Sequence, residues 1–355
     1  MPHVDRLFRL AMKTASALSV CVLLLGAGST IRADRADRTV IVTSSNAAAN
    51  QLLVFDTEGA LIQTVSTQGQ GGVGGNAGGI ATLGSTVAVV NFGSQSVTIF
   101  DRGPQGFRVG QLVPSLSSPV SVAFGHDHLY VLGTTTVESH RLQESAVDPG
   151  ADGVVALLRG DGSSAQVGVV GDQLVISEKS GVIEVVDLRE GAVVGSPAGV
   201  DIPVGSDTPF GLVTRGSNGY VTIAHSDEIS LIKNGRLVAL AATGSGFPNG
   251  PGQQAPCWIT LVGPYLFTSD SPSHTISRLI ASGGRILLDV PIAAHTTGAP
   301  IDIVADGDLL AVIEDNGNGQ SHLTQFRIDD NDNLVQVATS AIAASANGIA
   351  IVSQK

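Results

Sequence analysis

The stretch SAQVGVVGDQLVISEKSGVIEVVDL, residues Ser164–Leu188, carries the pattern on which the rest of the chain is built. Apolar β-forming residues lie between clusters of Gly, Asp and Ser, which is typical of short strands joined by tight turns. The Gly171-Asp172 pair would form the first turn and the segment Glu178–Gly181 the second. The pattern predicts three strands, at Gln166–Val170, Gln173–Ser177 and Val182–Leu188.

The same strand pattern recurs along the chain at intervals of 42 to 47 residues. The residue that closes the second strand of each copy is, in chain order, Asn46, Asn91, Gly133, Glu178, His225, Asp270 and Glu314. A period this regular indicates a repeat architecture, and four-stranded units of this length are typical of propeller blades. We therefore predict an all-β fold, a seven-bladed β-propeller.

The two ends of the repeat region predict how the ring closes. The first unit, Thr39–Ser66, has second, third and fourth strands but no inner strand before them. The segment Ala346–Ser353 is a lone inner strand that follows a complete seventh unit. Pairing this C-terminal strand with the N-terminal blade would close the ring and cover edges that an open sheet leaves exposed.

The N-terminus is typical of a secretory signal peptide. Arg6, Arg9 and Lys13 precede an apolar run, Ala15–Gly28, and small residues follow as far as Ala33. We predict a signal peptide at 1–33 and one propeller domain at 34–355 in a secreted or periplasmic protein. The run is short for a membrane-spanning helix, so a retained anchor is the weaker alternative, and we expect no stable membrane insertion after signal removal. We also expect a monomer.

The net charge of the chain narrows the range of partners. Removing residues 1–33 takes away four of the 19 basic and one of the 31 acidic residues, which leaves a net charge of −15. This balance opposes nucleic-acid binding and favours neutral or cationic partners.

Removal of the signal peptide also removes Cys21, so no internal disulfide can form. We expect the remaining Cys257 to be a structural thiol and not a nucleophile.

Two local motifs suggest ligand sites but favour simpler interpretations. Gly69–Gly74 fits the glycine pattern of dinucleotide-binding proteins, yet that site needs a helix to follow, and a strand is predicted at Ile80–Leu83. We interpret Gly69–Gly79 as a glycine-rich connection between blades. His126 and His128 have the spacing of a metal-binding pair, but they lie in a hairpin turn that we expect to be solvated.

Propeller geometry places the candidate site. The first two strands of a blade are antiparallel, so the end of the second lies beside the start of the first, and all blades bring these points to one mouth of the central channel. We predict a pocket there, with convergent polar groups and two aromatic faces. Its predicted ligand-binding residues are Asn91, Gln166, Phe210, Trp258, Asp270, Asp302, Glu314 and Asn347, and its predicted catalytic residues are Glu178 and His225.

Several segments resemble one known family. The motifs GGNAGGIA (74–81), SPVSVAFGHDHLYVLG (118–133), SDTPFGLV (206–213), APCWITLVGPYLFTSD (255–270) and APIDIVADGDLLAVIED (299–315) resemble the secreted, uncharacterised branch of the lactonase-like seven-bladed propellers. That superfamily includes 6-phosphogluconolactonases and carboxymuconate-lactonizing enzymes. The resemblance covers nearly all of residues 34–355. It implies the fold directly and the chemistry only weakly.

The resemblance implies a glutamate after a second strand, together with histidine and arginine at inner-strand starts. Glu178 matches the glutamate. At the basic positions this chain instead has Val120, Ala165 with Gln166, and Ile301. Without a cation aimed at the developing oxyanion, the largest electrostatic contribution to acyl transfer is missing. We therefore expect an exported protein that binds a small molecule, glycan or protein at the channel mouth.

The alternative is a hydrolase of uncharged lactones or esters. Glu178 or His225 would act as general base, and the enzyme would need a cation near Glu178, for which Lys179, Arg215 and Arg278 are candidates. No cofactor is required in either case, although a divalent cation held by Glu178, Asp270 and Glu314 would replace the missing positive charge. Polar residues at strand ends also often serve only to satisfy backbone groups or hold channel water.

Overall fold

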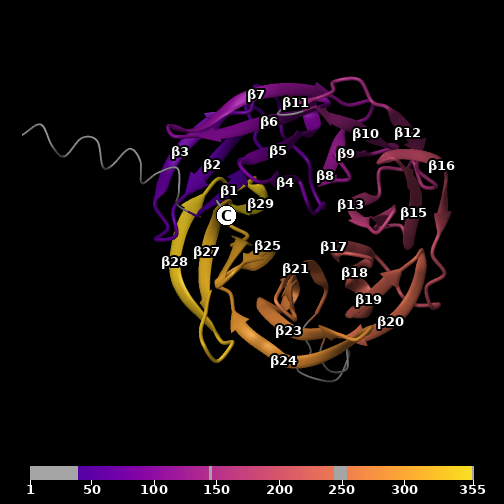
Figure 1. The fold of residues 1–355 in the computed structure, drawn as a ribbon. Coiled ribbons are helices and arrows are strands. Elements are labelled where there is room, and N and C mark those ends of the chain that lie inside the picture. Colours follow the sequence, from indigo (N-terminus) through magenta and orange to yellow (C-terminus); the bar gives the residue numbers. More distant parts are fainter. Residues whose placement is uncertain (1–38, 144–145, 244–253, 354–355) are drawn as a thin grey trace, which may run out of the picture.

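The computed structural model describes residues 39–143, 146–243 and 254–353, so the predicted signal peptide at 1–33 lies outside the described residues. The described residues form seven antiparallel sheets arranged in a ring, which confirms the predicted seven-bladed propeller (Figure 1). The innermost strands of the sheets surround the ring axis, and the outermost strands form its rim (Figure 1). Among these residues no helix has the length and apolar character that crossing a bilayer requires.

In every blade the strands succeed one another from the axis outward. Blade 1 contains β29 (Asn347–Val352), β1 (Val40–Ser44), β2 (Gln51–Phe55) and β3 (Leu61–Ser66). Blade 2 contains β4 (Ile80–Leu83), β5 (Thr86–Asn91), β6 (Ser96–Gly103) and β7 (Gly106–Pro114). Blade 3 contains β8 (Pro119–Gly125), β9 (His128–Gly133), β10 (Thr136–Gln143) and a split outer strand, β11 (Ala146–Val147) and β12 (Gly153–Ala156).

The remaining blades follow the same order. Blade 4 contains β13 (Ser164–Val170), β14 (Gln173–Glu178), β15 (Val182–Arg189) and β16 (Ala192–Gly199). Blade 5 contains β17 (Pro209–Arg215), β18 (Asn218–Ile223), β19 (Glu228–Lys233) and β20 (Arg236–Ala242). Blades 6 and 7 contain β21 (Pro256–Val262), β22 (Tyr265–Asp270), β23 (Thr275–Ser282), β24 (Arg285–His295), then β25 (Ala299–Asp306), β26 (Leu309–Asp315), β27 (Ser321–Ile328) and β28 (Leu334–Ile342).

Closure of the ring occurs as predicted. The C-terminal strand β29 pairs antiparallel with β1, with Val352 opposite Val40 and Ile351 opposite Ile41. The hydroxyl of Thr39 also donates to that of Ser353, 314 residues away in the sequence. Blade 1 is therefore built from both ends of the propeller domain.

Helical structure in the described residues is limited to three short 3₁₀ turns, in agreement with the sequence prediction. They are η1 (Phe92–Ser94), η2 (Ala224–Ser226) and η3 (Ser271–Ser273), and each follows the second strand of its blade. The hydrophobic core lies mainly between neighbouring blades, since each core cluster draws buried side chains from the facing sheets of adjacent blades, such as Val170 and Val221. The two ends of the axis, where strands start and turn, are left for polar groups and loops.

Candidate functional site at the two ends of the axis

The inner strands begin at one end of the axis, which we call the plugged end. There the end of each second strand lies beside the start of the first, as predicted: Glu178 pairs with Ser164, Asp270 with Pro256 and Glu314 with Pro300. In each of these blades a β-bulge follows that pair. The bulge changes the direction of the side chain that follows it, because the extra residue interrupts the alternation of side chains along the strand. Gln166, Trp258 and Asp302 follow these bulges.

The glycine-rich loop, Gly69–Gly79, crosses the plugged end. The side-chain amide of Asn76 donates to the carbonyl of Val120 in blade 3 at 2.5 Å, and the indole of Trp258 in blade 6 donates to the carbonyl of Asn76 at 3.0 Å. The backbone N–H of Ala77 donates to the carbonyl of Ala165 in blade 4 at 3.1 Å. The loop is a connection between blades, as predicted, and it also fastens three other blades across the axis.

Glycine is required where the loop passes closest to blades 3 and 4. Gly78 has a φ of +64°, and a side-chain carbon added there would lie 2.8 Å from both Gln166 Nε2 and Ser121 Oγ. An L-residue is strained at this φ and would collide with both side chains. The low-complexity composition of the loop therefore reflects close packing.

The predicted aromatic faces form part of the loop's binding surface. Phe210 and Trp258 meet edge to face, with ring centroids 5.0 Å apart. Both are buried, and they belong to the same hydrophobic cluster as Ala77 of the loop. Val120, at the inner-strand start of blade 3, is also buried. At the plugged end, these side chains pack against the chain itself in this conformation.

The carboxylates predicted for this end are buried and bonded within their own blades. Glu314 Oε2 accepts hydrogen bonds from the backbone N–H groups of Thr297 and Gly298 and from the Thr297 hydroxyl, at 2.6–3.1 Å. Asp270 accepts from the hydroxyls of Thr268, Thr275 and Ser277. These contacts satisfy the segment that enters blade 7 and the strands of blade 6, which is the simpler, structural role of polar residues at strand ends.

Glu178 is fully buried beside a second glutamate of blade 4, Glu184. Its Oε2 accepts from the hydroxyl of Ser163 at 3.0 Å, whereas its Oε1 and the Oε2 of Glu184 have no hydrogen-bond donor among the described residues. Burial first, and the negative charge of Glu184 second, raise the pKa of Glu178 to about 8. One proton shared between the two side chains would satisfy both free oxygens. This environment favours the protonated form of Glu178.

Burial has the same effect on two other predicted residues. It raises the pKa of Asp270 to about 8 even though Ser277 and Thr268 donate hydrogen bonds to it. It raises the pKa of Asp302 to about 7. A carboxylate that leaves water without a positive partner loses solvation, so its protonated form is favoured. The carboxyl groups of Asp270 and Asp302 are therefore protonated more readily than ordinary carboxyl groups.

The other predicted site residues have separate hydrogen-bond partners. Asn91 is buried and bonds to Thr98 and Asn50, and Gln166 accepts from the backbone N–H of Leu212 at 2.6 Å. His225 lies within η2, where its ring contacts the hydroxyl of Thr208 at 2.7 Å and is exposed. Among the described residues, no three His, Cys, Asp or Glu side chains lie close enough to hold one metal ion. A metal held by Glu178, Asp270 and Glu314 stays a prediction.

The three candidate cations lie in different places. Lys179 Nζ donates to the carbonyls of Gly75 and Ser164, at 2.6 and 3.3 Å, and so fastens the glycine-rich loop to blade 4. Burial lowers its pKa, partly offset by the charge of Glu178. Arg215 donates to the carbonyl of Gly263 in blade 6, and Arg278 pairs with Asp289. Of the three, Lys179 lies next to Glu178.

Cys257 is a half-buried thiol, and its environment supports the predicted structural role. Burial first, and the charge of Asp270 second, raise its pKa to about 12. Since the thiolate is the nucleophilic form, this environment disfavours reactivity.

The opposite end of the axis, where hairpins join the first and second strands, we call the hairpin end. A cavity of about 730 Å³ opens there between the inner strands β4, β25 and β29. Its lining combines apolar side chains with a carboxylate and hydroxyls, among them Ile80, Ser85, Asp306, Ile349, Ile351 and Ser353. The Ser353 hydroxyl donates to Asp306 at 2.8 Å. No sequence motif predicted this cavity, because its lining residues form ordinary strand patterns.

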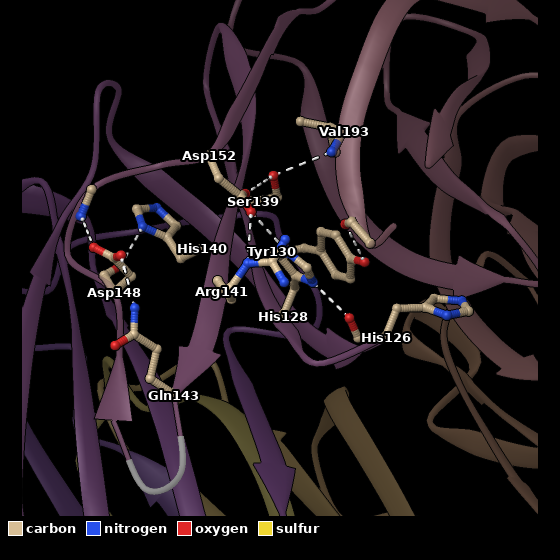
Figure 2. A network of polar contacts seen from close by, with 12 residues as sticks. His126, His128, Tyr130, Ser139, His140, Arg141, Gln143, Asp148, Asp152 and Val193 are labelled. Atoms are coloured by element: carbon tan, nitrogen blue, oxygen red, sulfur yellow. Dashed lines mark hydrogen bonds and ion pairs between the residues drawn. The ribbon is translucent and has the colours of Figure 1, made fainter. Parts of the chain in front are cut away.

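A polar network in blade 3 includes residues of the first hairpin of that blade, His126 and His128 (Figure 2). His128 Nε2 contacts Asp152 Oδ2 at 2.9 Å, and His128 Nδ1 contacts the carbonyl of His126 at 2.6 Å. Asp152 also accepts from the Ser139 hydroxyl at 2.7 Å. The expectation of a solvated hairpin is therefore wrong for His128, which is fully buried, and correct for the exposed His126. The network binds the hairpin to the outer part of its blade.

This network contains serine, histidine and aspartate but is connected differently from a catalytic triad. In a triad the histidine lies between the other two side chains and takes the serine proton. In blade 3, by contrast, Asp152 lies between Ser139 and His128, as Figure 2 shows, and Tyr130 stacks against the His128 ring at 6.0 Å. Both ring nitrogens of His128 contact oxygen atoms other than the Ser139 hydroxyl. The Ser139 hydroxyl donates to Asp152 and has no histidine among its hydrogen-bond partners in the described residues.

Comparison with known proteins supports the fold. Neither protein-family profiles nor curated proteins give a match to this chain. Several crystal structures are similar to it. One is a protein from Bacteroides fragilis, provisionally named a 6-phosphogluconolactonase, which is 13% identical to this chain with a TM-score of 0.62. The similarity covers 89% of this chain and 98% of that protein. A protein of the same provisional name from Bacteroides uniformis is 14% identical with a TM-score of 0.64, covering 89% and 99%.

A third similar structure shows how widely the fold is shared. Virginiamycin B lyase from Staphylococcus aureus, an inactive variant crystallised with quinupristin, is 14% identical with a TM-score of 0.53, covering 74% of this chain and 84% of that one. At such identities a likeness shows a common propeller and not a common reaction. The propeller fold expected from the sequence motifs is thus supported, and the chemistry has to be argued from this chain's own residues.

Proposed function

We propose that this chain is an exported lactonase-like propeller that binds a ligand in its axial channel without hydrolysing it. The observation that carries this proposal is the cavity of about 730 Å³ at the hairpin end. Its size suits a small molecule, a sugar unit or a short peptide segment. Asp306 at the cavity and the net charge of −12 favour neutral or cationic ligands over anionic ones.

Filling the cavity tests this proposal. Ser85 lines the cavity in the first hairpin of blade 2, and Ser217 is its counterpart in the hairpin of blade 5, away from the cavity lining. We expect neutral or cationic members of a small-molecule and oligosaccharide panel to raise the melting temperature of residues 34–355 and of Ser217→Trp. Ser85→Trp should abolish the rise. An equal rise in both variants, or none with any compound, would contradict binding in this cavity.

Export is a separate part of the proposal and rests on the N-terminal pattern at 1–33. We expect the full chain, expressed with its own N-terminus, to be recovered outside the cytoplasm with an N-terminus near Asp34. N-terminal sequencing of the exported protein measures this directly. Recovery of the uncut chain in the cytoplasm would contradict it.

A lactone hydrolase built on Glu178 is the second candidate, and the position of Lys179 favours it, because this cation lies next to the glutamate. With the pKa of Glu178 at about 8, a general-base reaction should accelerate as pH rises through that value. Assays of uncharged lactones with the wild-type protein and Glu178→Gln decide the matter. Activity that rises toward pH 8 and is lost in Glu178→Gln would establish the enzyme, and equal rates would remove it.

A further inference from the structure

Three buried oxygen atoms beneath the glycine-rich loop have no hydrogen-bond partner among the described residues. They are Asn76 Oδ1 in the loop, Asp302 Oδ2 in β25 and Asn347 Oδ1 in β29. Asn76 is fully buried and Asp302 is 5% exposed. An unsatisfied buried polar atom is costly and rare in folded proteins, so three from separate segments indicate a missing partner.

These three side chains gather around one backbone junction. A side-chain carbon added at Gly79 would lie 3.3 Å from Asn76 Nδ2 and 3.8 Å from Asn347 Oδ1. Gly348, which follows Asn347, packs against Gly79, with 3.3 Å between its ideal side-chain carbon and the carbonyl carbon of Gly79. The backbone N–H of Gly348 also lies close enough to the Asp302 carboxyl group to act against the rise in the pKa of that group. All three side chains therefore adjoin the contact between Gly79 and Gly348.

Hydrogen bonds show which side-chain atoms of Asn76 and Asp302 are left without a partner. Asn76 Nδ2 donates to the carbonyl of Val120, so its other amide atom, the free one, is the oxygen. Asp302 Oδ1 accepts from the backbone N–H of Ile303 at 2.9 Å, which leaves Oδ2 free. No ion pair among the described residues includes Asp302. The site thus offers acceptors, one of them a carboxylate, and lacks a positive charge.

We propose that the plugged end binds a calcium-like hard cation through the Asp302 carboxylate and the amide oxygens of Asn76 and Asn347. A water molecule donates only two hydrogen bonds, so it leaves one of the three oxygens without a partner. It also does not balance the charge of the ionised carboxylate. A cation satisfies all three oxygens and balances the charge. Ca²⁺ accepts mixed carboxylate and amide oxygen ligands in flexible geometry, whereas Mg²⁺ demands near-ideal octahedral geometry.

The cation site continues into the cavity of the hairpin end. Asp302 lies two residues before Val304, Asn347 two before Ile349, and Gly79 directly before Ile80, and these three followers line the cavity. Alternate residues of a regular strand share one side, which places Asp302 on the same side of its strand as Val304. Between Asn347 and Ile349 a β-bulge interrupts this alternation. An ion would enter from the hairpin end. The free oxygens define this site whether or not a ligand occupies the cavity.

Terbium luminescence provides a local test, because the chain has one tryptophan, and Trp258 bonds directly to the backbone of Asn76. We expect chelator-treated protein to sensitise Tb³⁺ emission on selective excitation of Trp258, and Ca²⁺ to displace the signal. Calorimetry with Ca²⁺ alone should give one site. Ions at surface carboxylates far from Trp258 would not be sensitised, so the readout reports this site.

Two aspartates provide matched variants, one at the proposed site and one away from it. Asp302→Asn should weaken Ca²⁺ at least about tenfold, since even outer-shell changes at metal sites cost that much. Asp127→Asn, in the exposed first hairpin of blade 3, should keep wild-type affinity. If Asp302→Asn fails the circular-dichroism check for folding, Asn347→Ala replaces it, with the same expected loss. Absence of sensitised emission and heat in the wild type, or equal affinity in the variants, would overturn the proposal, whereas the Ser85→Trp experiment tests cavity binding alone.

Discussion

The plugged end and the polar network of blade 3 hold carboxyl groups in opposite electrostatic states. At the plugged end Glu178 and Asp270 are buried without a cationic hydrogen-bond partner among the described residues, and their pKa values rise to about 8. In the blade 3 network, burial would also raise the pKa of Asp152. There, hydrogen bonds from Ser139 and His128 and the charges of His128 and Arg141 outweigh burial, and the pKa falls below its ordinary value. Partners, and not residue type, therefore decide which acids are charged.

The two ends of the axis also differ in how much room they leave for a ligand. Acidic and aromatic residues marked the plugged end as the candidate site, yet the glycine-rich loop and the blades use most of them for packing and internal hydrogen bonds. The hairpin end, whose sequence is less distinctive, has the open cavity. Substitutions at the plugged end and in the blade 3 network should therefore differ in the size of their effect and in its pH dependence, with the largest loss at the plugged end.

Trp258→Ala, at the plugged end, should cause the largest loss of stability among these substitutions. It removes a buried ring that contacts Phe210 and the bond to the Asn76 carbonyl. We expect a loss of about 3–5 kcal/mol in the free energy of unfolding, measured by urea denaturation. Trp258→Phe keeps most of the ring and should lose only about 1 kcal/mol. Equal, small losses in the two variants would show that the loop is not held by this side chain.

Glu178→Gln should remove the pH dependence of stability that the raised pKa of Glu178 causes. Folded protein keeps this proton up to about pH 8, whereas the unfolded chain releases it near 4.5, so wild-type stability falls as pH rises between these values. The variant lacks this fall and should gain on the order of 3 kcal/mol over the wild type by pH 8. Stability curves across this range measure the gain. Exposed Glu58→Gln is the control, and a curve parallel to the wild type for Glu178→Gln would contradict the prediction.

Asp152→Asn should show the opposite pH dependence. Its lowered folded pKa means that the charged form stabilises the fold above the ordinary aspartate value, and that this stabilisation is lost as pH falls through the folded pKa. We expect a loss of about 1–2 kcal/mol at neutral pH that shrinks in acid. Urea denaturation at several pH values measures it, with exposed Asp127→Asn as the control. A loss independent of pH would assign the effect to packing.

His126→Ala should have the smallest effect. The ring of His126 is exposed and contacts only the carbonyl of Gly171, at 2.8 Å, among the described residues. We expect a change within about 0.5 kcal/mol by the same denaturation measurement. A larger loss would show that the whole hairpin, and not His128 alone, belongs to the buried network.

The fold could be predicted because a strand pattern and its period are local properties. The Gly171-Asp172 turn, the strand Ile80–Leu83 and the pairing of the C-terminal strand with blade 1 all appear as predicted. These features need only the alternation of apolar residues and the punctuation by glycine and aspartate. The predicted inner strand of blade 4 begins two residues early, at Ser164, because a bulge at Ala165 interrupts the alternation.

The site was harder to predict because it depends on contacts between distant segments. Asn76 gave no local signal, and its role arises from Val120 and Trp258, which lie far along the chain. The one available hint was the length of Gly69–Gly79, since loops this long without secondary structure are uncommon in compact domains and often functional. Nor could the sequence show that Glu184 lies beside Glu178, because a diagonal pairing across strands depends on register.

Closure of blade 1 by β29 and β1 has a consequence for the order of folding. The contact between Thr39 and Ser353 joins residues 314 positions apart, and bringing them together costs loop-closure entropy that no local contact offsets. Until β29 is synthesised, β1 remains an open edge, ready to pair with other chains. A protein exported as an unfolded chain and closed only after its last strand arrives would avoid this exposure within the crowded cytoplasm.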